Sequence, residues 1–258
     1  MTSATPYSAD RSLYGKLRRR LARLVHKRPA SLSLTRPLLT ISFDDAPVSS
    51  AQIGAAILEK HNACGTWFIS SGLMGGQSHL GAYTQADDIR RLAANGHEIA
   101  CHTHDHLDCG KASKAAITAN LDQNQKAFAG NGFPVATTFA YPYGDVSPQA
   151  KSVLKSRFLA SRGLHHGLIT TGTDLNQTPA VGIEGADGEA VAMRWLERAK
   201  QQQAWLVLYT HDVRESPSGW GCTPEVLDRL ITQALDMGFE IVTYAEGARR
   251  AQALSPSE

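Results

Sequence analysis

Short apolar stretches typical of buried strands alternate with amphipathic helical stretches along most of this chain. The expected strands are residues 38–43, 66–69, 98–101, 137–140, 158–161, 205–209 and 239–243, and the expected helices are residues 52–61, 86–94, 113–128, 147–154, 188–202, 223–235 and 245–254. The strands are almost continuously apolar, which is typical of a parallel sheet buried on both faces. Repeated β–α units in about this number, roughly seven, predict an α/β barrel rather than an open sheet.

Residues that begin and end helices support these boundaries. Ser113 can cap the helix that follows it, and Ser147 and Thr223 are each followed by a proline at the first helical position. Gly96 and Gly238 follow expected helices at the position where glycine commonly ends them. The alternation therefore rests on capping chemistry as well as on hydrophobic pattern.

The beginning of the chain differs from the remainder in charge. Residues 1–36 contain nine Lys or Arg and a single acid, Asp10, whereas the remainder has 17 basic and 23 acidic residues. We therefore divide the chain into a basic arm with a linker, residues 1–37, and a body, residues 38–258. The body shows no basic patch of the kind that binds nucleic acid.

Residues 12–27 predict an amphipathic helix capped by Ser12. Its apolar side consists of Leu13, Leu17, Leu21, Leu24 and Val25, and arginines fill the other side. Two interpretations are equally compatible with this pattern: residues 12–28 contact an anionic membrane surface, or the leucines pack on the body and the arginines face water. An organellar transit peptide has a similar composition.

The sequence also bears on the compartment. No segment is apolar over the length of a membrane span, and the first residues lack the apolar core of a secretory signal. We therefore expect a cytoplasmic protein, either free or at the inner face of a membrane. The four cysteines form no CxxC pair, so we expect reduced thiols; a Cys101–Cys109 disulfide and a thiol near a metal are the alternatives.

Polar residues follow the expected strands at the points where the strands end. They are Asp44 and Asp45, His102 and His106, Pro142 and Tyr143, and His211 and Asp212. In a parallel barrel the carboxyl ends of all strands lie at one rim, where active sites are built. The topology therefore predicts that these residues meet.

Carboxylates and imidazoles delivered to one rim suit a divalent cation with an open coordination position. His102 and His106 are neighbours if their segment forms a helical turn, and Asp45 then completes the ligand set and leaves Asp44 free as a base. In an extended segment His102, His104 and His106 share a face and bind metal without Asp45. The first arrangement predicts metal-assisted hydrolysis. Iron oxygenases use similar ligands but on antiparallel barrels, which the β–α alternation disfavours.

These residues resemble the motifs of the polysaccharide deacetylases, carbohydrate esterase family four with its NodB homology domain, over about residues 38–247. Ser42-Phe43-Asp44-Asp45 is similar to the family's first motif, in which the first aspartate is the general base and the second binds metal. His102-Thr103-His104-Asp105-His106 is similar to its metal-binding histidine motif. The segments 140–144 and 209–212 stand where the family has Arg-x-Pro-Tyr and Leu-x-His.

The resemblance implies roles for single residues. His211 would be the general acid, and the backbone N–H of Tyr143, after Pro142, would stabilise the oxyanion. The match also has departures: Ala140 replaces the arginine that pairs with the base, and the family's Asp-and-Trp motif has no clean counterpart. We expect Arg162 to replace the arginine and Asp174 to partner the acid. Trp220, Tyr209 and Pro142 are the expected substrate-binding residues, with Trp220 and Tyr209 lining the acetyl pocket.

The fold implied by the resemblance is a distorted (β/α)7 barrel in residues 38–258. The implied activity is removal of N-acetyl or O-acetyl groups from a saccharide or polysaccharide by a metal-dependent hydrolase. Zn²⁺ is the expected metal, and Co²⁺, Ni²⁺ and Fe²⁺ are alternatives. Two other hypotheses stay open: a hydrolase of a cyclic imide, ureide or other small amide on the same fold, and a non-catalytic saccharide-binding protein.

Overall fold

A curled parallel sheet forms the centre of the computed structural model, which describes residues 10 and 12–252. Along the sheet the strands follow the order β7-β6-β5-β2-β1-β9-β8, and β10 pairs with the beginning of β1. Their bounds are β1 Leu38–Asp44, β2 Thr66–Ile69, β5 Glu98–Cys101, β6 Thr138–Ala140, β7 Ala160–Arg162, β8 Val181–Gly182, β9 Trp205–Thr210 and β10 Glu240–Ile241. Every pairing within this sheet is parallel.

The two edges of the sheet are joined by a single short segment. Thr178 exchanges backbone hydrogen bonds with β7, donating to Ser161 and accepting from Gly163. A few residues later β8 pairs with β9, which lies near the other edge. The sheet is therefore a distorted barrel, and the predicted fold class is confirmed. Strand β8, which is only two residues long, was not predicted from the sequence.

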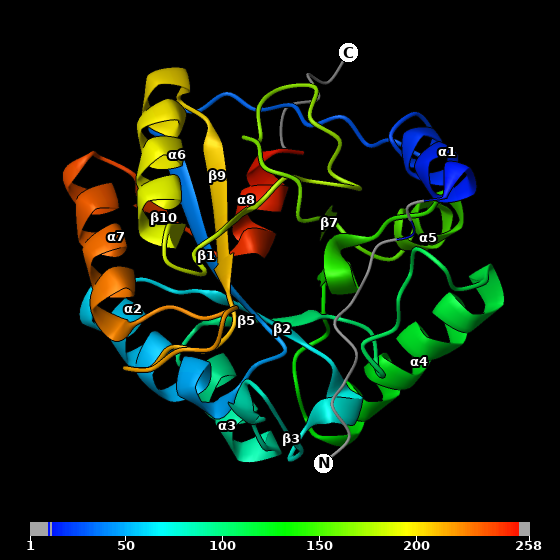
Figure 1. Cartoon of the computed structure of the whole chain (residues 1–258), viewed down its shortest axis with the longest axis horizontal. Coiled ribbons are helices and arrows are strands. Elements are labelled where there is room, and N and C mark those ends of the chain that lie inside the picture. Colours follow the sequence, from blue (N-terminus) through cyan, green and yellow to red (C-terminus); the bar gives the residue numbers. More distant parts are fainter. Residues whose placement is uncertain (1–9, 11, 253–258) are drawn as a thin grey trace.

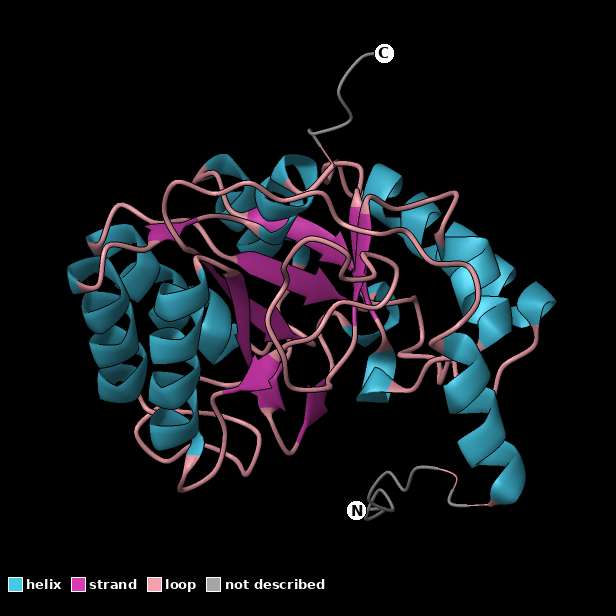
Figure 2. Cartoon of the chain, turned by 90° about the horizontal axis from the view of Figure 1, so that it is seen from above, coloured by secondary structure: helices cyan, strands magenta, loops and turns pink. Residues whose placement is uncertain are grey.

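Helices surround the sheet, as Figures 1 and 2 show. They are α2 Ala55–Lys60, α3 Ala86–Ala94, α4 Lys114–Gly130, α5 Pro148–Leu154, α6 Gly188–Gln202, α7 Pro224–Asp236 and α8 Tyr244–Arg250. A π-helical turn, Ser50–Gly54, precedes α2, and short 3-10 turns occupy Ser71–Leu73 and Pro142–Gly144. The side chains of Ser113, Ser147 and Thr223 cap α4, α5 and α7 as predicted. A small hairpin of β3 Gln77–Ser78 and β4 Gly81–Ala82 was not predicted. Part of the closing helix predicted for residues 245–254 lies outside the described residues.

Alternation along the strands decides which side chains enter the barrel. In β9, Leu206 and Leu208 pack in the outer core beneath the helices, whereas Trp205, Val207 and Tyr209 pack in the inner core. The same period of two holds in β1, where Leu39, Ile41 and Phe43 face outward. Asp44 therefore points inward at the carboxyl end of β1. Arg162 in β7 has the same parity as the inward Ala160.

The arm forms helix α1, Leu13–Ala22, which lies beside α5 (Figure 1). Ser12 caps the helix as predicted, but the helix ends five residues earlier than the predicted Lys27. Its leucines do not pack on the body: Leu13, Leu17 and Leu21 are exposed. The interpretation in which the leucines are buried and the arginines solvated is therefore wrong, because a buried Arg18 faces the body instead.

Two further expectations concern the whole chain. Cys64, Cys101, Cys109 and Cys222 are all free, so the Cys101–Cys109 disulfide does not form. Within the described residues, none of the helices combines the length and apolar character needed to cross a bilayer.

Candidate active site

Asp44 lies at the end of β1 with its carboxylate buried inside the barrel. Burial alone would raise the pKa of Asp44, but the positive charge of Arg162, helped by His102 and His211, outweighs burial, so the pKa lies below its ordinary value. The group is therefore an anion at neutral pH, which a general base must be.

Arg162 supplies the counter-charge that the sequence lacks at Ala140. Its Nη2 donates to Oδ1 and Oδ2 of Asp44 at 2.5 and 2.6 Å, and its side chain is fully buried. The guanidinium lies over the rings of Phe68 and Tyr209, 5.0 Å from each centroid. Because Ala140 and Arg162 are direct neighbours in the pairing of β6 with β7, the arginine reaches the same place from the next strand.

Asp45, His102 and His106 form a second cluster beside this pair. Each offers one ligand atom, and the three atoms lie within 4.8 Å of one another. Asp45 Oδ1 is 3.3 Å from His106 Nε2 and 3.8 Å from His102 Nε2. Ligands to one cation with bonds of about 2 Å lie roughly 3–3.5 Å apart. The cluster therefore has nearly the spacing that one ion requires.

The chemistry of the three donors also fits a cation. His102 Nδ1 donates to the carbonyl oxygen of Ala140 at 2.8 Å, which leaves the Nε2 lone pair directed to the cluster. Burial lowers the pKa of His102 to about 3 and that of His106 to about 4, so both imidazoles are neutral. Asp45 Oδ1 is buried without a hydrogen-bond partner. A buried carboxylate oxygen facing two neutral imidazoles lacks the positive charge that a divalent cation would supply.

The backbone is strained where it delivers these side chains. Five of the eight non-glycine residues with positive φ among the described residues lie in the site's segments: Asp45, Ala46, Thr103, His106 and Tyr143. Such conformations cost about 1–3 kcal/mol each and persist where the surroundings enforce them, often at functional sites. At Asp45 the turn separates the two carboxylates, so that Asp44 meets Arg162 while Asp45 meets the histidines.

His104 and Asp105 are not part of the cluster. His104 Nδ1 bonds Ser71 Oγ at 2.7 Å, and Asn120 binds the backbone N–H groups of both residues. Asn120 also donates to the Asp105 carboxylate. The alternative in which His102, His104 and His106 bind one metal is therefore not formed, because the 102–106 segment turns instead of running straight.

We expect Asp45→Gly to weaken zinc binding by more than about 100-fold, because even the loss of an outer contact to a metal ligand costs 10–100-fold. Glycine suits the positive φ of 61° at this position, so backbone strain does not confound the result. His104→Ala is the matched control and should keep the affinity of the original protein. Calorimetric titration with Zn²⁺ measures both; equal affinity in all three proteins would show that Asp45 is not a ligand.

His211 follows β9 at the same rim. A protonated His211 lowers the pKa of both Asp44 and Asp45, so it lies within their electrostatic reach. Its Nδ1 lies 3.2 Å from the carbonyl oxygen of Trp220, and its backbone N–H donates to the same oxygen. Asp212 is buried and accepts from Ser218, which holds the loop 211–222. The loop thus orients the imidazole through Trp220.

Two exposed aromatic residues, Tyr143 and Trp220, each contact a histidine of the site. The ring of Tyr143, in the turn that Pro142 begins, packs edge-on against His106 with centroids 4.4 Å apart. Tyr143 is 41% exposed and the side chain of Trp220 is 52% exposed. Exposed aromatic surface beside a polar centre is well suited to pack on the apolar face of a sugar ring.

Asp174 does not partner the acid. Its Oδ1 accepts from the backbone N–H groups of Arg28 and Asn176, and its Oδ2 accepts from Lys151. The prediction for Asp174 is therefore wrong for a physical reason: the Lys151 ammonium has no exposed surface and needs a counter-ion.

Glu184 is a residue of the site that the sequence analysis missed. It follows β8, and its Oε1 accepts from the hydroxyl of Tyr209 at 3.0 Å. Burial raises the pKa of Glu184 to about 7 despite this hydrogen bond, and its Oε2 is buried without a partner. The sequence evidence that could have placed Glu184 at the rim was the apolar segment Val181–Ile183 before it. This segment is too short to be identified as a strand from its hydrophobic pattern. Tyr209 thus contacts both charged residues: its ring lies against the Arg162 guanidinium, and its hydroxyl donates to the Glu184 carboxyl group.

Glu184 should make the metal-free protein less stable as pH rises. The pKa of Glu184 is about 7 in the folded protein against 4.5 in the unfolded chain, so the stability present at low pH is lost as pH rises through 7. In Glu184→Gln this loss is absent. Urea unfolding should show the variant gaining about 2 kcal/mol relative to the original protein between about pH 5 and 8, after allowance for solvent screening. If the free energies of unfolding of the two proteins differed by the same amount at about pH 5 and at about pH 8, the conclusion that burial raises the pKa of Glu184 would be contradicted.

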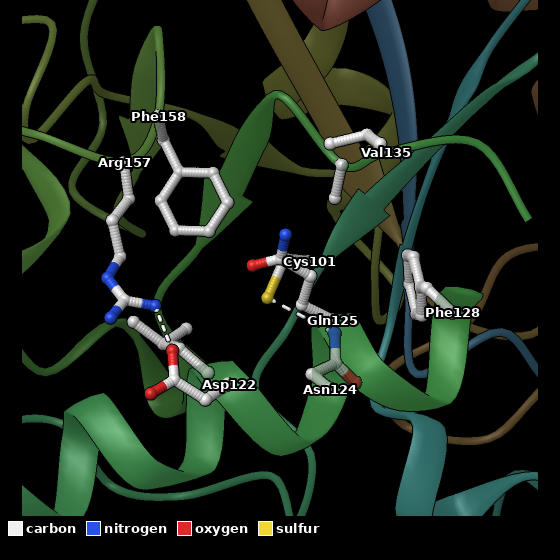
Figure 3. A pocket seen from close by; sticks show the side chains of 10 residues that line it. Cys101, Asp122, Asn124, Gln125, Phe128, Val135, Arg157 and Phe158 are labelled. Carbon is white, nitrogen blue, oxygen red and sulfur yellow. Dashed lines mark hydrogen bonds and ion pairs between the residues drawn. The ribbon is translucent and has the colours of Figure 1, made fainter. Parts of the chain in front are cut away.

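A cavity lies elsewhere, on the outer side of β5 against α4 (Figure 3). Its volume is about 360 Å³, and its lining includes Cys101, Phe128, Phe158 and the Arg157–Asp122 ion pair. Asn124 donates to Cys101 Sγ, and burial raises the pKa of this thiol to about 12. A thiol that stays protonated is no nucleophile. The cavity therefore contains no group equipped for hydrolysis, unlike the rim.

Comparison with known proteins agrees with this geometry. Residues 32–158 match the family model of the polysaccharide deacetylases. The chain is 27% identical over 114 residues, 44% of its length, to a chitin deacetylase of a Pestalotiopsis species, and 26% identical over 166 residues, 60% of its length, to a poly-β-1,6-N-acetyl-D-glucosamine N-deacetylase of Staphylococcus aureus. These alignments span 37% and 57% of the two relatives, so the chain corresponds to only part of each.

Solved structures share the fold. A chitin deacetylase from the fungal pathogen Colletotrichum lindemuthianum superposes with a TM-score of 0.59 and 19% identity, over 84% of this chain and 89% of that chain. A family 4 acetyl xylan esterase from Clostridium thermocellum, in complex with a cobalt ion, gives a TM-score of 0.60 and 21% identity over 84% of this chain and 92% of that chain. The family model and these relatives show that residues 32–158 resemble the polysaccharide deacetylases, and the solved structures show that the chain shares their fold.

Proposed function

We propose that this protein removes N-acetyl groups from a saccharide or polysaccharide by metal-dependent hydrolysis. The observation that carries the proposal is the meeting of two sets of groups at one rim. Asp45, His102 and His106 offer three ligand atoms to one point, and Asp44 stands next to them as a carboxylate held ionised by Arg162. The relatives named as chitin and poly-N-acetylglucosamine deacetylases support a substrate carrying N-acetyl groups.

The residues divide the reaction among them. Asp45, His102 and His106 would hold a divalent cation, most simply Zn²⁺, which supplies positive charge that polarises water and the acetyl carbonyl. Asp44 accepts the proton of the attacking water, and Arg162 keeps its carboxylate charged and oriented. The backbone N–H of Tyr143 donates to the developing oxyanion.

The second half of the reaction needs an acid, because an amine leaves only after protonation. We assign this role to His211, whose Nδ1 is directed at the carbonyl oxygen of Trp220 so that Nε2 carries the transferable proton. Trp220 and Tyr143 provide exposed rings at the mouth for the sugar, and Tyr209, fixed by Glu184, forms the inner wall of the acetyl pocket.

The two rival functions fit the site less well. The hypothesis of a cyclic imide or ureide hydrolase rested on the arginine missing at Ala140. Arg162 forms an ion pair with Asp44 from the strand next to that of Ala140. The missing arginine at position 140 is therefore no longer a reason to prefer this hypothesis over acetyl hydrolysis. A non-catalytic saccharide-binding protein would not require a strained backbone at this rim. It would also not require a base next to two neutral imidazoles and a buried carboxylate oxygen that has no hydrogen-bond partner.

The test is acetate release from N-acetylglucosamine oligomers with β-1,4 and β-1,6 linkages, alongside acetylated xylan as an ester substrate. Zinc-loaded protein should release acetate from at least one N-acetyl substrate, and chelation followed by dialysis should stop the reaction until metal is restored. Release from xylan alone would assign O-deacetylation instead. Turnover that survives chelation, or no acetate from any substrate with metal bound, would contradict the proposal.

A further inference from the structure

Helix α1 presents a row of large apolar side chains to solvent. Leu13, Tyr14, Leu17, Leu21 and Leu24 are 84%, 71%, 56%, 43% and 63% exposed. These are five of the ten large hydrophobic residues exposed among the described residues, gathered within twelve positions. The four leucines recur at intervals of three and four, so they form one stripe along the helix and its C-terminal turn. Scattered exposed leucines need no explanation, but a contiguous patch marks an interaction surface.

Polar contacts, and not these leucines, fix the arm to the body. Gly15, Arg18 and Ala22 form the side of α1 that faces the body. Arg18 Nη2 pairs with Asp145 Oδ2 at 2.5 Å, and both side chains are nearly fully buried. Lys151, itself buried, donates to the carbonyl oxygen of Ala22 at 2.6 Å. The helix lies beside α5 (Figure 1) and is attached by charged groups on α5 and on the loop before it.

The segment after the helix is attached in the same way. Asn176 donates to the carbonyl oxygen of His26, and Arg28 donates to the carbonyl oxygens of Phe158 and Leu159. Turning the leucines inward would break the buried Arg18–Asp145 pair, which is strongly unfavourable. The orientation with the leucines outward is therefore built into the attachment of the arm.

Cations border the leucine stripe. Lys16, Arg20, Arg23 and Lys27 are exposed, and none of them forms an ion pair within residues 12–252. Lys16 and Arg20 lie one turn apart next to the stripe, on the side away from the body. The surface thus combines apolar side chains with unneutralised positive charge, on a helix already held in place.

We propose that α1 docks the protein on an anionic membrane surface. The leucines enter the boundary between headgroups and acyl chains, and the four cations face the headgroup phosphates, the arrangement that basic amphipathic helices adopt at an interface. Charge complementarity selects this occupant over a second copy of the chain, because two copies meeting through α1 would bring their unpaired cations together. Asp145, the anchor of Arg18, lies two residues after Tyr143, so the docked helix is attached to the loop at the mouth of the candidate active site.

Vesicle co-sedimentation of the full chain tests the proposal. The protein should bind phosphatidylcholine vesicles that contain about 30% phosphatidylglycerol and bind pure phosphatidylcholine much more weakly, and binding should fall as salt rises because of screening. Leu17→Glu with Leu21→Glu should lower the partition coefficient at least about tenfold. Arg20→Glu with Arg23→Glu should also lower it and remove most of its salt dependence.

Control variants test whether a loss of vesicle binding is specific to α1 or follows from added negative charge anywhere on the protein. Val135, 73% exposed on the loop after α4, gives the apolar control Val135→Glu, and Lys114→Glu with Lys126→Glu on α4 repeats the charge change elsewhere. Both controls should bind like the original protein. Absence of vesicle binding, or an equal loss in the α4 control, would overturn the proposal. So would a dimer in light scattering that dissociates in the leucine variant while vesicles are not bound. The outcome is independent of the acetate assay.

Discussion

Asp44→Asn should lower kcat for acetate release by about 10²–10⁴-fold, the contribution of a positioned general base, while the protein keeps its bound metal. The asparagine is nearly the same size but cannot accept the proton of the attacking water. Because the proposed metal ligands are Asp45, His102 and His106, the zinc content should equal that of the original protein. Steady-state kinetics and metal analysis on the same sample measure the two quantities.

The control for this variant is Asp105→Asn on the neighbouring segment. Asp105 is largely exposed and bonds Asn120 outside the metal cluster, so its loss of charge should leave kcat within a few-fold of the original value. If Asp44→Asn retained ordinary turnover, Asp44 would not be the base. If it lost its metal as well, Asp44 would belong to the ligand set, and the division of labour between the two carboxylates would be wrong.

Arg162→Leu should reduce the free energy of unfolding by about 3–5 kcal/mol, because it leaves the carboxylate of Asp44 buried without a counter-charge. Arg162 is fully buried, donates to both oxygens of Asp44 and lies between two aromatic rings. Arg162→Lys should recover only part of this stability, since a compact ammonium group neither forms a fork nor stacks on rings. Urea unfolding measures each value.

A double substitution identifies the origin of that loss. In Asp44→Asn with Arg162→Leu no unpaired charge remains, so the double variant should be more stable than Arg162→Leu alone. Arg157→Leu is the control, because its pair with Asp122 lies at the surface and should contribute less than about 1 kcal/mol. Additive effects of Asp44→Asn and Arg162→Leu would show that the two side chains do not interact as the structure indicates.

Several elements were predicted from the sequence with both bounds correct. Residues 66–69, 86–94, 98–101 and 188–202 agree with β2, α3, β5 and α6. The element β8 was missed because two residues cannot show a period, and Glu184 was missed with it. Short strands that exist only through their neighbours' hydrogen bonds leave no local pattern to detect.

The part of the candidate site that depends on strand topology could be predicted from the sequence. Parallel strands bring their carboxyl ends to one rim, so the sequence alone predicts that Asp44, Asp45, His102 and His106 meet. The placement of Arg162 on Asp44 followed from the same rule, because adjacent strands present equivalent positions side by side. The sequence could not indicate the turn at His106 that leaves His104 outside the cluster, because a positive φ at histidine has no signature.

The wrong predictions for the arm helix and for Asp174 share one cause. A hydrophobic pattern shows which side of the arm helix is apolar but not which side packs against the body of the protein. Here Arg18 is buried against the body while the leucines are exposed. Asp174 was assigned to the acid because nothing in the sequence marks Lys151 as a buried cation in need of a carboxylate. Pairings between charges distant in sequence depend on the packed structure.

Anomalous diffraction from a crystal of the zinc-loaded protein, recorded on both sides of the zinc absorption edge, tests the central claim most directly. We predict one strong peak at bonding distance from Asp45 Oδ1, His102 Nε2 and His106 Nε2, with the Asp44 carboxylate still paired to Arg162. A peak bound by other residues, or none at this rim in protein shown to contain zinc, would contradict the account.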